Sequence, residues 1–213
     1  TYGDFGRNST TLNVNHRSKK FALFGTYSHF QGKATGFFDM LRIQGNNVFD
    51  GETNSERDML NDRLNVGGDY YLNDYSTVSF AFGGNMNNRE NRSTSITPIS
   101  QLGSSEVDSI LRAPNVDKNE VQNLNANINY TYKDTSGRTL SFDLDWVSYN
   151  QDQESLQPNF YVSPSNEFVT SENINFQDTP IEIDVYSFKT DYEQKLWKGV
   201  FATGIKVSDV QTN

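Results

Sequence analysis

Apolar and polar residues alternate strictly along residues 123–150. In the first part the even positions carry Leu, Ala, Ile, Tyr and Tyr, while the odd positions carry asparagines and a threonine. After Asp134-Thr135-Ser136-Gly137 the same alternation resumes. Alternation predicts β-strands, because successive side chains of a strand point to opposite faces of a sheet. The Asp-Thr-Ser-Gly stretch is typical of a turn, so residues 123–150 are predicted to form a β-hairpin.

Similar patterns predict three further hairpins, which turn at residues 18–20, 73–75 and 194–198. The chain is therefore predicted to be all-β, with about eight antiparallel strands and no helix. The connections between hairpins are long, polar and rich in Asn, Ser, Asp and Glu: 33–56, 88–119 and 150–179. In an up-and-down meander, all short turns then lie at one end of the sheet and all long loops at the other. Membrane β-barrels have this asymmetry, with short periplasmic turns and long extracellular loops.

The length of the patterned stretches indicates what the apolar face contacts. They run about 10–12 residues, which at roughly 3.3 Å per residue and a 45° tilt span about 25 Å, the height of an outer-membrane apolar band. Lipid is thus the predicted partner of Leu124, Ile128, Tyr130, Leu140, Phe142, Leu144 and Trp146. A wet lumen is the predicted environment of Asn123, Asn125, Asn127, Asn129, Asp143 and Asp145. Residues 88–119 and 150–179 are expected outside the cell.

Composition narrows the function classes. Hydrophobic residues make up 34% of the 213 residues, which is low for a soluble globule. Aromatic residues make up 13%, which argues against disorder. The net charge of -9 argues against nucleic acid as a partner. The chain contains no cysteine, so it forms no disulfide and no thiolate metal site.

Residues capable of catalytic or metal chemistry are scattered. His16 and His29 flank the first turn, but hairpin pairing places His29 opposite roughly residue 9, some 20 Å from His16. Asp143 and Asp145 share the inward side and would suit a carboxylate pair or a cation, although such residues more often line a water-filled wall.

Other motifs favour structural roles. A solvated loop is predicted for the acidic run, which lacks the spacing of a calcium loop: Glu106, Asp108, Asp117 and Glu120. Gly67-Gly68 and Gly83-Gly84 lie within strand patterns, where glycine permits close packing or curvature. Phe160 and Tyr161 would stack on a sugar or aromatic ligand, but packing within their loop is the favoured interpretation. We predict no enzyme activity, no cofactor and no catalytic, cofactor-binding or metal-binding residue.

Three stretches resemble strands of a known family. IDVYSFKTDYEQKLWKGVFATGIKVSDVQTN (183–213), LNVNHRSKKFALFGTYSHF (12–30) and LNVGGDYYLNDYSTVSFAFGGN (64–85) are similar to barrel segments of Bacteroidetes TonB-dependent receptors. The resemblance implies a barrel of about 22 strands in the bacterial outer membrane, with an N-terminal plug, that imports bulky nutrients. It implies as partners the outer-membrane lipid, the rest of the parent barrel and its plug, the TonB complex and a surface lipoprotein.

The chain departs from the full family pattern, because it shows no plug, no TonB box and no terminal aromatic residue. We therefore expect residues 1–213 to be part of one barrel domain of a larger chain. Residues 10–17 and 200–210 are then expected to pair with strands outside this sequence, or to be bare edges, and not to pair with each other. Two alternatives remain: a small complete outer-membrane barrel with a structural or adhesive role, and a soluble β-sandwich that binds a ligand.

Overall fold

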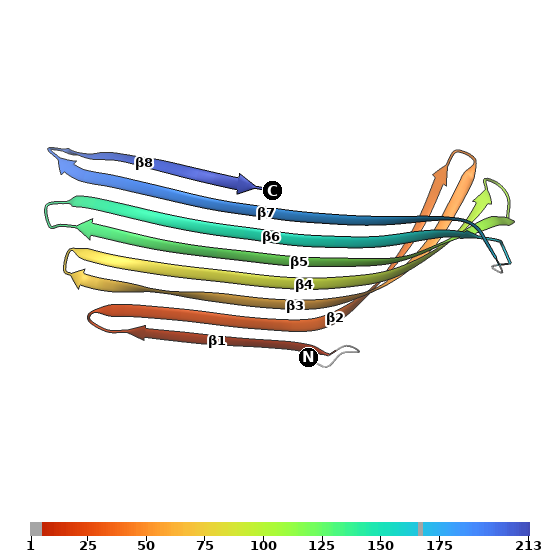
Figure 1. The fold of residues 1–213 in the computed structure, drawn as a ribbon, viewed down its shortest axis with the longest axis horizontal. Helices are drawn as coiled ribbons and strands as arrows, with labels where there is room; N and C mark the ends of the chain where they lie inside the picture. The colour runs from red at the N-terminus through yellow and green to blue at the C-terminus, as the bar shows by residue number, and fades with distance from the viewer. Residues whose placement is uncertain (1–5, 166–167) are drawn as a thin grey trace.

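The computed structural model describes residues 6–165 and 168–213, which form eight β-strands in one antiparallel sheet (Figure 1). The strands lie side by side in chain order, as in an up-and-down meander. They are β1 (Arg7–Arg17), β2 (Phe21–Gln44), β3 (Asn47–Asn73), β4 (Ser76–Gln101), β5 (Val107–Lys133), β6 (Arg138–Val162), β7 (Val169–Leu196) and β8 (Gly199–Thr212). The predicted fold class, strand number and order are confirmed.

Short turns join the strands at one end of the sheet, at the positions that turn chemistry predicts (Figure 1). In the β5–β6 turn, Asp134 Oδ1 accepts hydrogen bonds from the backbone N–H groups of Ser136 at 2.9 Å and Arg138 at 3.0 Å. Gly137 has a φ of 82°, a conformation that residues with a Cβ rarely adopt. The sequence Asp-Thr-Ser-Gly is therefore suited to this turn.

The long connections are not irregular loops, and this part of the sequence-based prediction is wrong. Strands β2 to β7 each extend over 24 to 28 residues, through most of 33–56, 88–119 and 150–179. These segments are polar or mixed on both faces, so they lack the alternation that indicates a strand. Their backbones still pair, and the β2–β3 hairpin turns only at 45–46.

The register divides the side chains between two faces. Direct cross-strand partners share a face, and one such row consists of Leu23, Gly68, Phe80, Ile128, Leu144, Phe188 and Val207. We call the face that carries this row the apolar face. The opposite face carries Asn125, Asn127, Asn129, Asp143 and Asp145, and we call it the polar face. The predicted grouping of these residues on two faces is confirmed.

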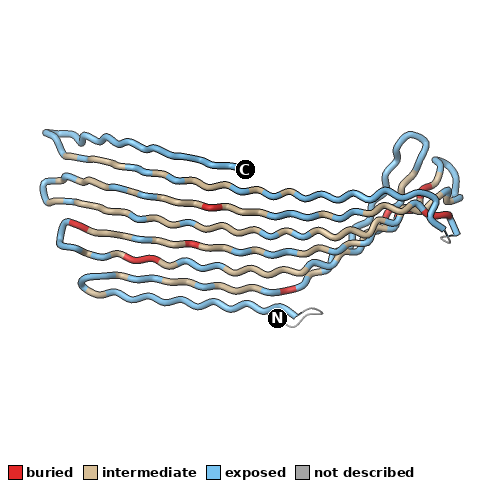
Figure 2. Tube along the Cα trace, in the orientation of Figure 1, coloured by how far each residue is buried: buried red, intermediate tan, exposed pale blue. Residues whose placement is uncertain are grey.

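Few of the described residues are buried (Figure 2), and many large hydrophobic side chains are exposed. Leu144 on the apolar face is 54% exposed, whereas neighbouring Asp145 on the polar face is half-buried. Among the described residues, Ile99 and Val162 are the only buried hydrophobic side chains. A compact soluble protein of this length exposes about 10,000 Å², whereas this chain exposes 14791 Å². No second sheet covers the apolar face within residues 6–165 and 168–213, as a β-sandwich would require.

Glycines in β3 permit a close approach between neighbouring strands. A Cβ on Gly67 would lie 2.5 Å from the Phe24 ring, and a Cβ on Gly68 would lie 2.5 Å from Leu23 Cδ2. The close-packing role predicted for these glycines is confirmed. Large side chains of β2 thus lie over a glycine on each face of β3.

The sheet is open in the described part of the chain. There β1 pairs only with β2 and β8 only with β7, so residues 10–17 form no ladder with 200–210 (Figure 1). The same part of the chain contains no helix long and apolar enough to cross a membrane.

Candidate transport wall and charged row

A hydrogen-bonded network crosses the polar face from β5 to β7. Asn127 Nδ2 donates to Asp145 Oδ1 at 2.6 Å, and Ser187 Oγ donates to Asp145 Oδ2 at 3.1 Å. One row nearer the short turns, Asn129 Nδ2 donates to Asp143 Oδ1 at 2.7 Å. Each of the two carboxylates thus accepts a hydrogen bond from its own asparagine. The carboxylate oxygens have further lone pairs that can accept hydrogen bonds from water.

Asp143 and Asp145 therefore belong to a polar wall. Lys189 is the cross-strand partner of Asp143, and its Nζ lies 2.5 Å from Asp191 Oδ2. Charges of both signs consequently occur on this face. No group of three or more His, Asp or Glu side chains within the described residues is placed to hold a metal ion.

The wall continues onto β4 and β5 beyond these residues. There the side-chain oxygens of Asn85, Asn91, Asn115 and Asn119 are enclosed without a hydrogen-bond partner from the described residues. Buried acceptors of this kind are normally satisfied by ordered water or a bound solute. This face is therefore suited to contact with water rather than with a protein core.

The two histidines lie on the apolar face and far apart. His29 pairs with Thr10 and His16 with Leu23, so hairpin pairing places His29 within one residue of the expected position. His29 Nδ1 lies 2.8 Å from Asp62 Oδ1, which also accepts a hydrogen bond from the Tyr27 hydroxyl at 2.6 Å. Asp62 was not singled out from the sequence, because its contact with His29 depends on the β2–β3 register.

Two other sequence-based interpretations need correction. Asp108, Asp117 and Glu120 lie within β5 and not in a loop, and Asp117 Oδ1 accepts a hydrogen bond from Ser155 Oγ at 2.6 Å. Phe160 and Tyr161 are consecutive residues of β6, so their side chains point to opposite faces. They form neither a loop cluster nor a joint stacking surface.

A row of charged residues crosses the apolar face. It lies farther from the short turns than the row of Leu23, Ile128 and Leu144. Each residue is the direct cross-strand partner of the next: Lys33, Asp58, Glu90, Lys118, Glu154 and Asp178. We call this set the charged row. Sequence reasoning missed it, because its members lie on six different strands and only the register aligns them.

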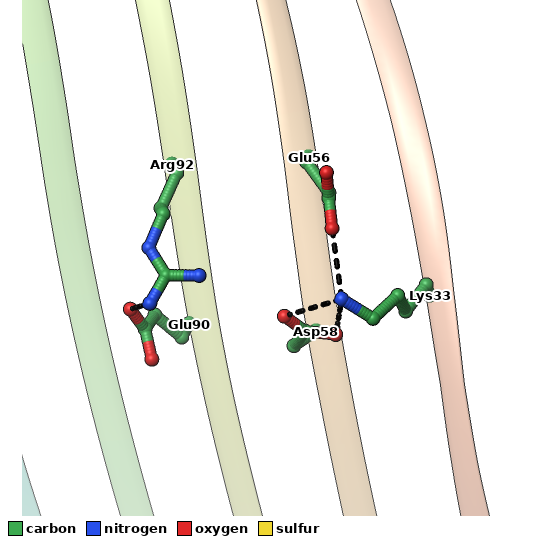
Figure 3. Close-up of polar contacts among 5 residues, drawn as sticks. All are labelled: Lys33, Glu56, Asp58, Glu90 and Arg92. Carbon is green, nitrogen blue, oxygen red and sulfur yellow. Dashed lines mark hydrogen bonds and ion pairs between the residues drawn. The ribbon is translucent and has the colours of Figure 1, made fainter.

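Ion pairs occupy the β2–β4 part of the charged row (Figure 3). Lys33 Nζ lies 2.8 Å from Glu56 Oε1 and 3.1 Å from Asp58 Oδ1. Hydrogen bonds to Glu56, and next to Asp58, raise the pKa of the Lys33 ammonium above its ordinary value. On β4, Arg92 Nη2 lies 2.5 Å from Glu90 Oε1. The charged row does not mark the first charges on this face, because Asp62, Glu120 and Glu182 lie on the same face nearer the short turns.

Residues 130–213, which extend from the end of β5 through β8, match the model of the outer membrane protein beta-barrel family. The match places the chain in the bacterial outer membrane, and its up-and-down antiparallel meander is the fold of an outer-membrane β-barrel segment. No curated protein matches this chain. Because the chain lies in the outer membrane, lipid surrounds the exposed apolar face, and the polar face lines the inside of the barrel.

Proposed function

We propose that the barrel protein is part of a TonB-dependent receptor that imports a bulky nutrient. The observation that carries this proposal is the polar wall on an open sheet. Edge strands β1 and β8 leave N–H and C=O groups unpaired within the described residues, and each such group costs several kcal/mol in lipid. Further strands of a larger barrel would satisfy them and widen the lumen.

In this proposal the two halves of each long strand have different roles. The halves near the short turns cross the membrane, and their polar face lines the route of the nutrient. The hairpins beyond the charged row project outward; from Lys33 to Gln44 alone β2 extends about 40 Å. They would capture the nutrient and contact a surface lipoprotein, while a plug and the TonB complex would control its passage.

A small complete barrel with an adhesive role is the second candidate, and the long projecting hairpins favour it. An eight-stranded barrel is filled by side chains and has no route for a bulky solute. It would also require a ladder between β1 and β8, which the described residues do not form. The transport proposal therefore accounts for more of the geometry.

Gene deletions in the native bacterium test the proposal. One strain lacks the full-length gene and a second lacks TonB, and both are grown on panels of oligosaccharides, peptides, cobalamin and ferric siderophores as limiting nutrients. We expect at least one nutrient to be lost in both strains. Transport is excluded if the first strain loses none but fails to adhere to surfaces, and TonB dependence is excluded if the second strain retains the nutrient that the first has lost.

A further inference from the structure

Four arginine side chains lie on the polar face, farther from the short turns than Asp145. They are Arg7 on β1, Arg57 and Arg63 on β3, and Arg89 on β4. Cross-strand pairing places all four on the face that carries Asn125 and Asn127. None of the four forms an ion pair with any of residues 6–165 or 168–213. We call these four residues the arginine cluster.

The acidic neighbours of these arginines point to the other face of the sheet. Three short stretches of β3 and β4 each place an arginine beside an acidic residue: Glu56-Arg57-Asp58, Asp62-Arg63 and Arg89-Glu90. Successive residues of a strand face opposite ways, so the arginines face the lumen and the acidic side chains face outward. The stretches are nearly neutral in sequence, and the sheet separates their charges.

Carboxylates are scarce on the polar face around the arginine cluster. From the row of Arg63 to the row of Arg57, Asp117 is the only carboxylate that the described strands place on this face. Its two oxygens already accept hydrogen bonds, from Ser155 Oγ at 2.6 Å and from Asn115 Nδ2 at 2.7 Å. This part of the wall is therefore positively charged, although the chain has a net charge of -9.

Amide groups beside the arginines present hydrogen-bond donors as well. Three arginines each have an asparagine as direct cross-strand partner: Arg57 with Asn91, Arg63 with Asn85, and Arg89 with Asn119. The Oδ1 atoms of these asparagines are enclosed and the Nδ2 atoms are not. N–H groups of both residue types thus face the lumen at these positions, and the oxygen atoms of an anion would accept hydrogen bonds from them.

The arginines are spaced to contact more than one anionic group. Arg89 pairs with Met59, so Arg57 is its diagonal neighbour, with Cα atoms about 7–8 Å apart. Both guanidinium groups can therefore reach one oxyanion. Arg7 lies in the row of Arg89, three strand spacings or about 14 Å away. A Cβ on Gly32 would lie 3.1 Å from Arg7 Cγ, so this glycine lets the Arg7 side chain lie across β2.

We propose that the arginine cluster binds a bulky anionic solute through its phosphate or carboxylate groups. Arg57 and Arg89 hold one such group in charge-assisted hydrogen bonds, which the planar guanidinium group forms in pairs, and Arg7 and Arg63 contact further groups. A neutral sugar would gain no charge-assisted bond from a carboxylate here. The inference names the substrate class of the proposed transport route, and it rests on that proposal for the passage of the solute but not for its binding.

Isothermal titration calorimetry of the full-length protein in detergent measures this binding. The probes are myo-inositol hexakisphosphate, benzenehexacarboxylate and myo-inositol, which carry phosphates, carboxylates and hydroxyl groups on a ring of six carbons. We expect at least one of the two anions to bind, and the tighter one identifies the group that the cluster prefers. Myo-inositol should not bind. Failure of both anions to bind, or equal binding of myo-inositol, would overturn the proposal.

Substitutions of exposed arginines locate the site. Arg57→Gln and Arg89→Gln should each weaken binding of the anion at least about tenfold, the factor that one charge-assisted hydrogen bond supplies. Arg89→Lys should restore only part of the loss, because an ammonium lacks the bidentate fork. Unchanged binding in both glutamine variants would contradict the assignment.

Arg112→Gln is the matched control for these variants. Arg112 is exposed, lies on β5 on the same face as Ile128 and forms no ion pair within the described residues. Its variant should bind the anion as the unmodified protein does, and an equal loss there would show non-specific attraction and overturn the proposal.

Calorimetry involves no uptake, so its outcome is separate from that of the gene deletions. Anion binding that depends on Arg57 and Arg89, without loss of any nutrient on deletion, would support the site and exclude transport. Loss of a nutrient without anion binding would support transport and exclude the site.

Discussion

The two halves of each long strand share one backbone ladder but differ in their side chains. Near the short turns, β6 alternates strictly, with Leu144 on the apolar face and Asp143 and Asp145 on the polar face. Beyond the charged row the same strand carries Ser155, Leu156 and Gln157 without a long apolar run. Backbone pairing is therefore sufficient for strand formation in both halves, whereas strict alternation marks only the half that lipid surrounds.

Labelling of single cysteines should give opposite results at the two ends of the sheet. Residues 1–213 contain no cysteine, so Asn46→Cys at the β2–β3 tip and Ser136→Cys in the β5–β6 turn each introduce a thiol that is unique within this sequence. On intact cells a membrane-impermeant maleimide should label Asn46→Cys and leave Ser136→Cys unmodified until the outer membrane is opened. Labelling of Ser136→Cys alone on intact cells would invert the topology.

Arginine scanning of β6 should distinguish lipid from water along one face. Leu144 and Leu156 are both on the apolar face and are 54% and 42% exposed. Leu144→Arg should reduce the free energy of unfolding by about 2–4 kcal/mol, because it places a charge in the bilayer. Leu156→Arg should change it by no more than about 0.5 kcal/mol, as at an aqueous surface.

Denaturant unfolding of the full-length protein in lipid vesicles measures both changes. Asn127→Arg, on the polar face of β5 and near Leu144 along the sheet, is the control for the opposite side. It should cost far less than Leu144→Arg. Equal costs for Leu144→Arg and Leu156→Arg would remove the distinction between the two halves.

Alanine at glycine positions should show where strand packing is tight. A Cβ on Gly68 would lie 2.5 Å from Leu23 Cδ2 and 2.6 Å from the Ala22 carbonyl oxygen, which is backbone and moves little. Gly68→Ala should therefore destabilise the protein by about 1–3 kcal/mol. In the projecting half, a Cβ on Gly36 meets only the rotatable Ser55 Oγ at 2.8 Å, so Gly36→Ala should cost less in the same unfolding assay.

The smallest expected effect concerns the β5–β6 turn. Hydrogen bonds from Ser136, first from its hydroxyl, and from the Arg138 N–H hold the pKa of Asp134 below its ordinary value. A lowered folded-state pKa stabilises the protein above the unfolded-state value, and this contribution is lost as the pH falls through the folded-state pKa, below about pH 4. Asp134→Asn should lack that contribution at neutral pH and converge with the unmodified protein in acid.

Unfolding curves recorded between neutral and acidic pH measure this convergence. Asp74→Asn is the control, because Asp74 lies in the β3–β4 turn and its carboxylate accepts no hydrogen bond from the described residues. Its stability should follow that of the unmodified protein at every pH. A constant difference between Asp134→Asn and the unmodified protein would show that the carboxylate charge has no role in the turn.

The sequence by itself determined the hairpins, the turns and the division of residues into two faces. This information is local: alternation has a period of two residues, and the residues at 134–137 specify their own turn. The same reasoning placed Leu144 and Asn127 on opposite faces and Gly68 in a closely packed strand, which the register confirms.

Only the tertiary structure decided how far the strands extend and which distant side chains meet. Residues 33–56 pair as strands although neither face shows a periodic apolar pattern, because the ladder uses backbone groups that every residue except proline carries in full. The charged row and the contact between His29 and Asp62 depend on pairing between strands that lie tens of residues apart. A shift of one residue in that pairing would move each partner to the other face, so no single segment of the sequence contains these sites.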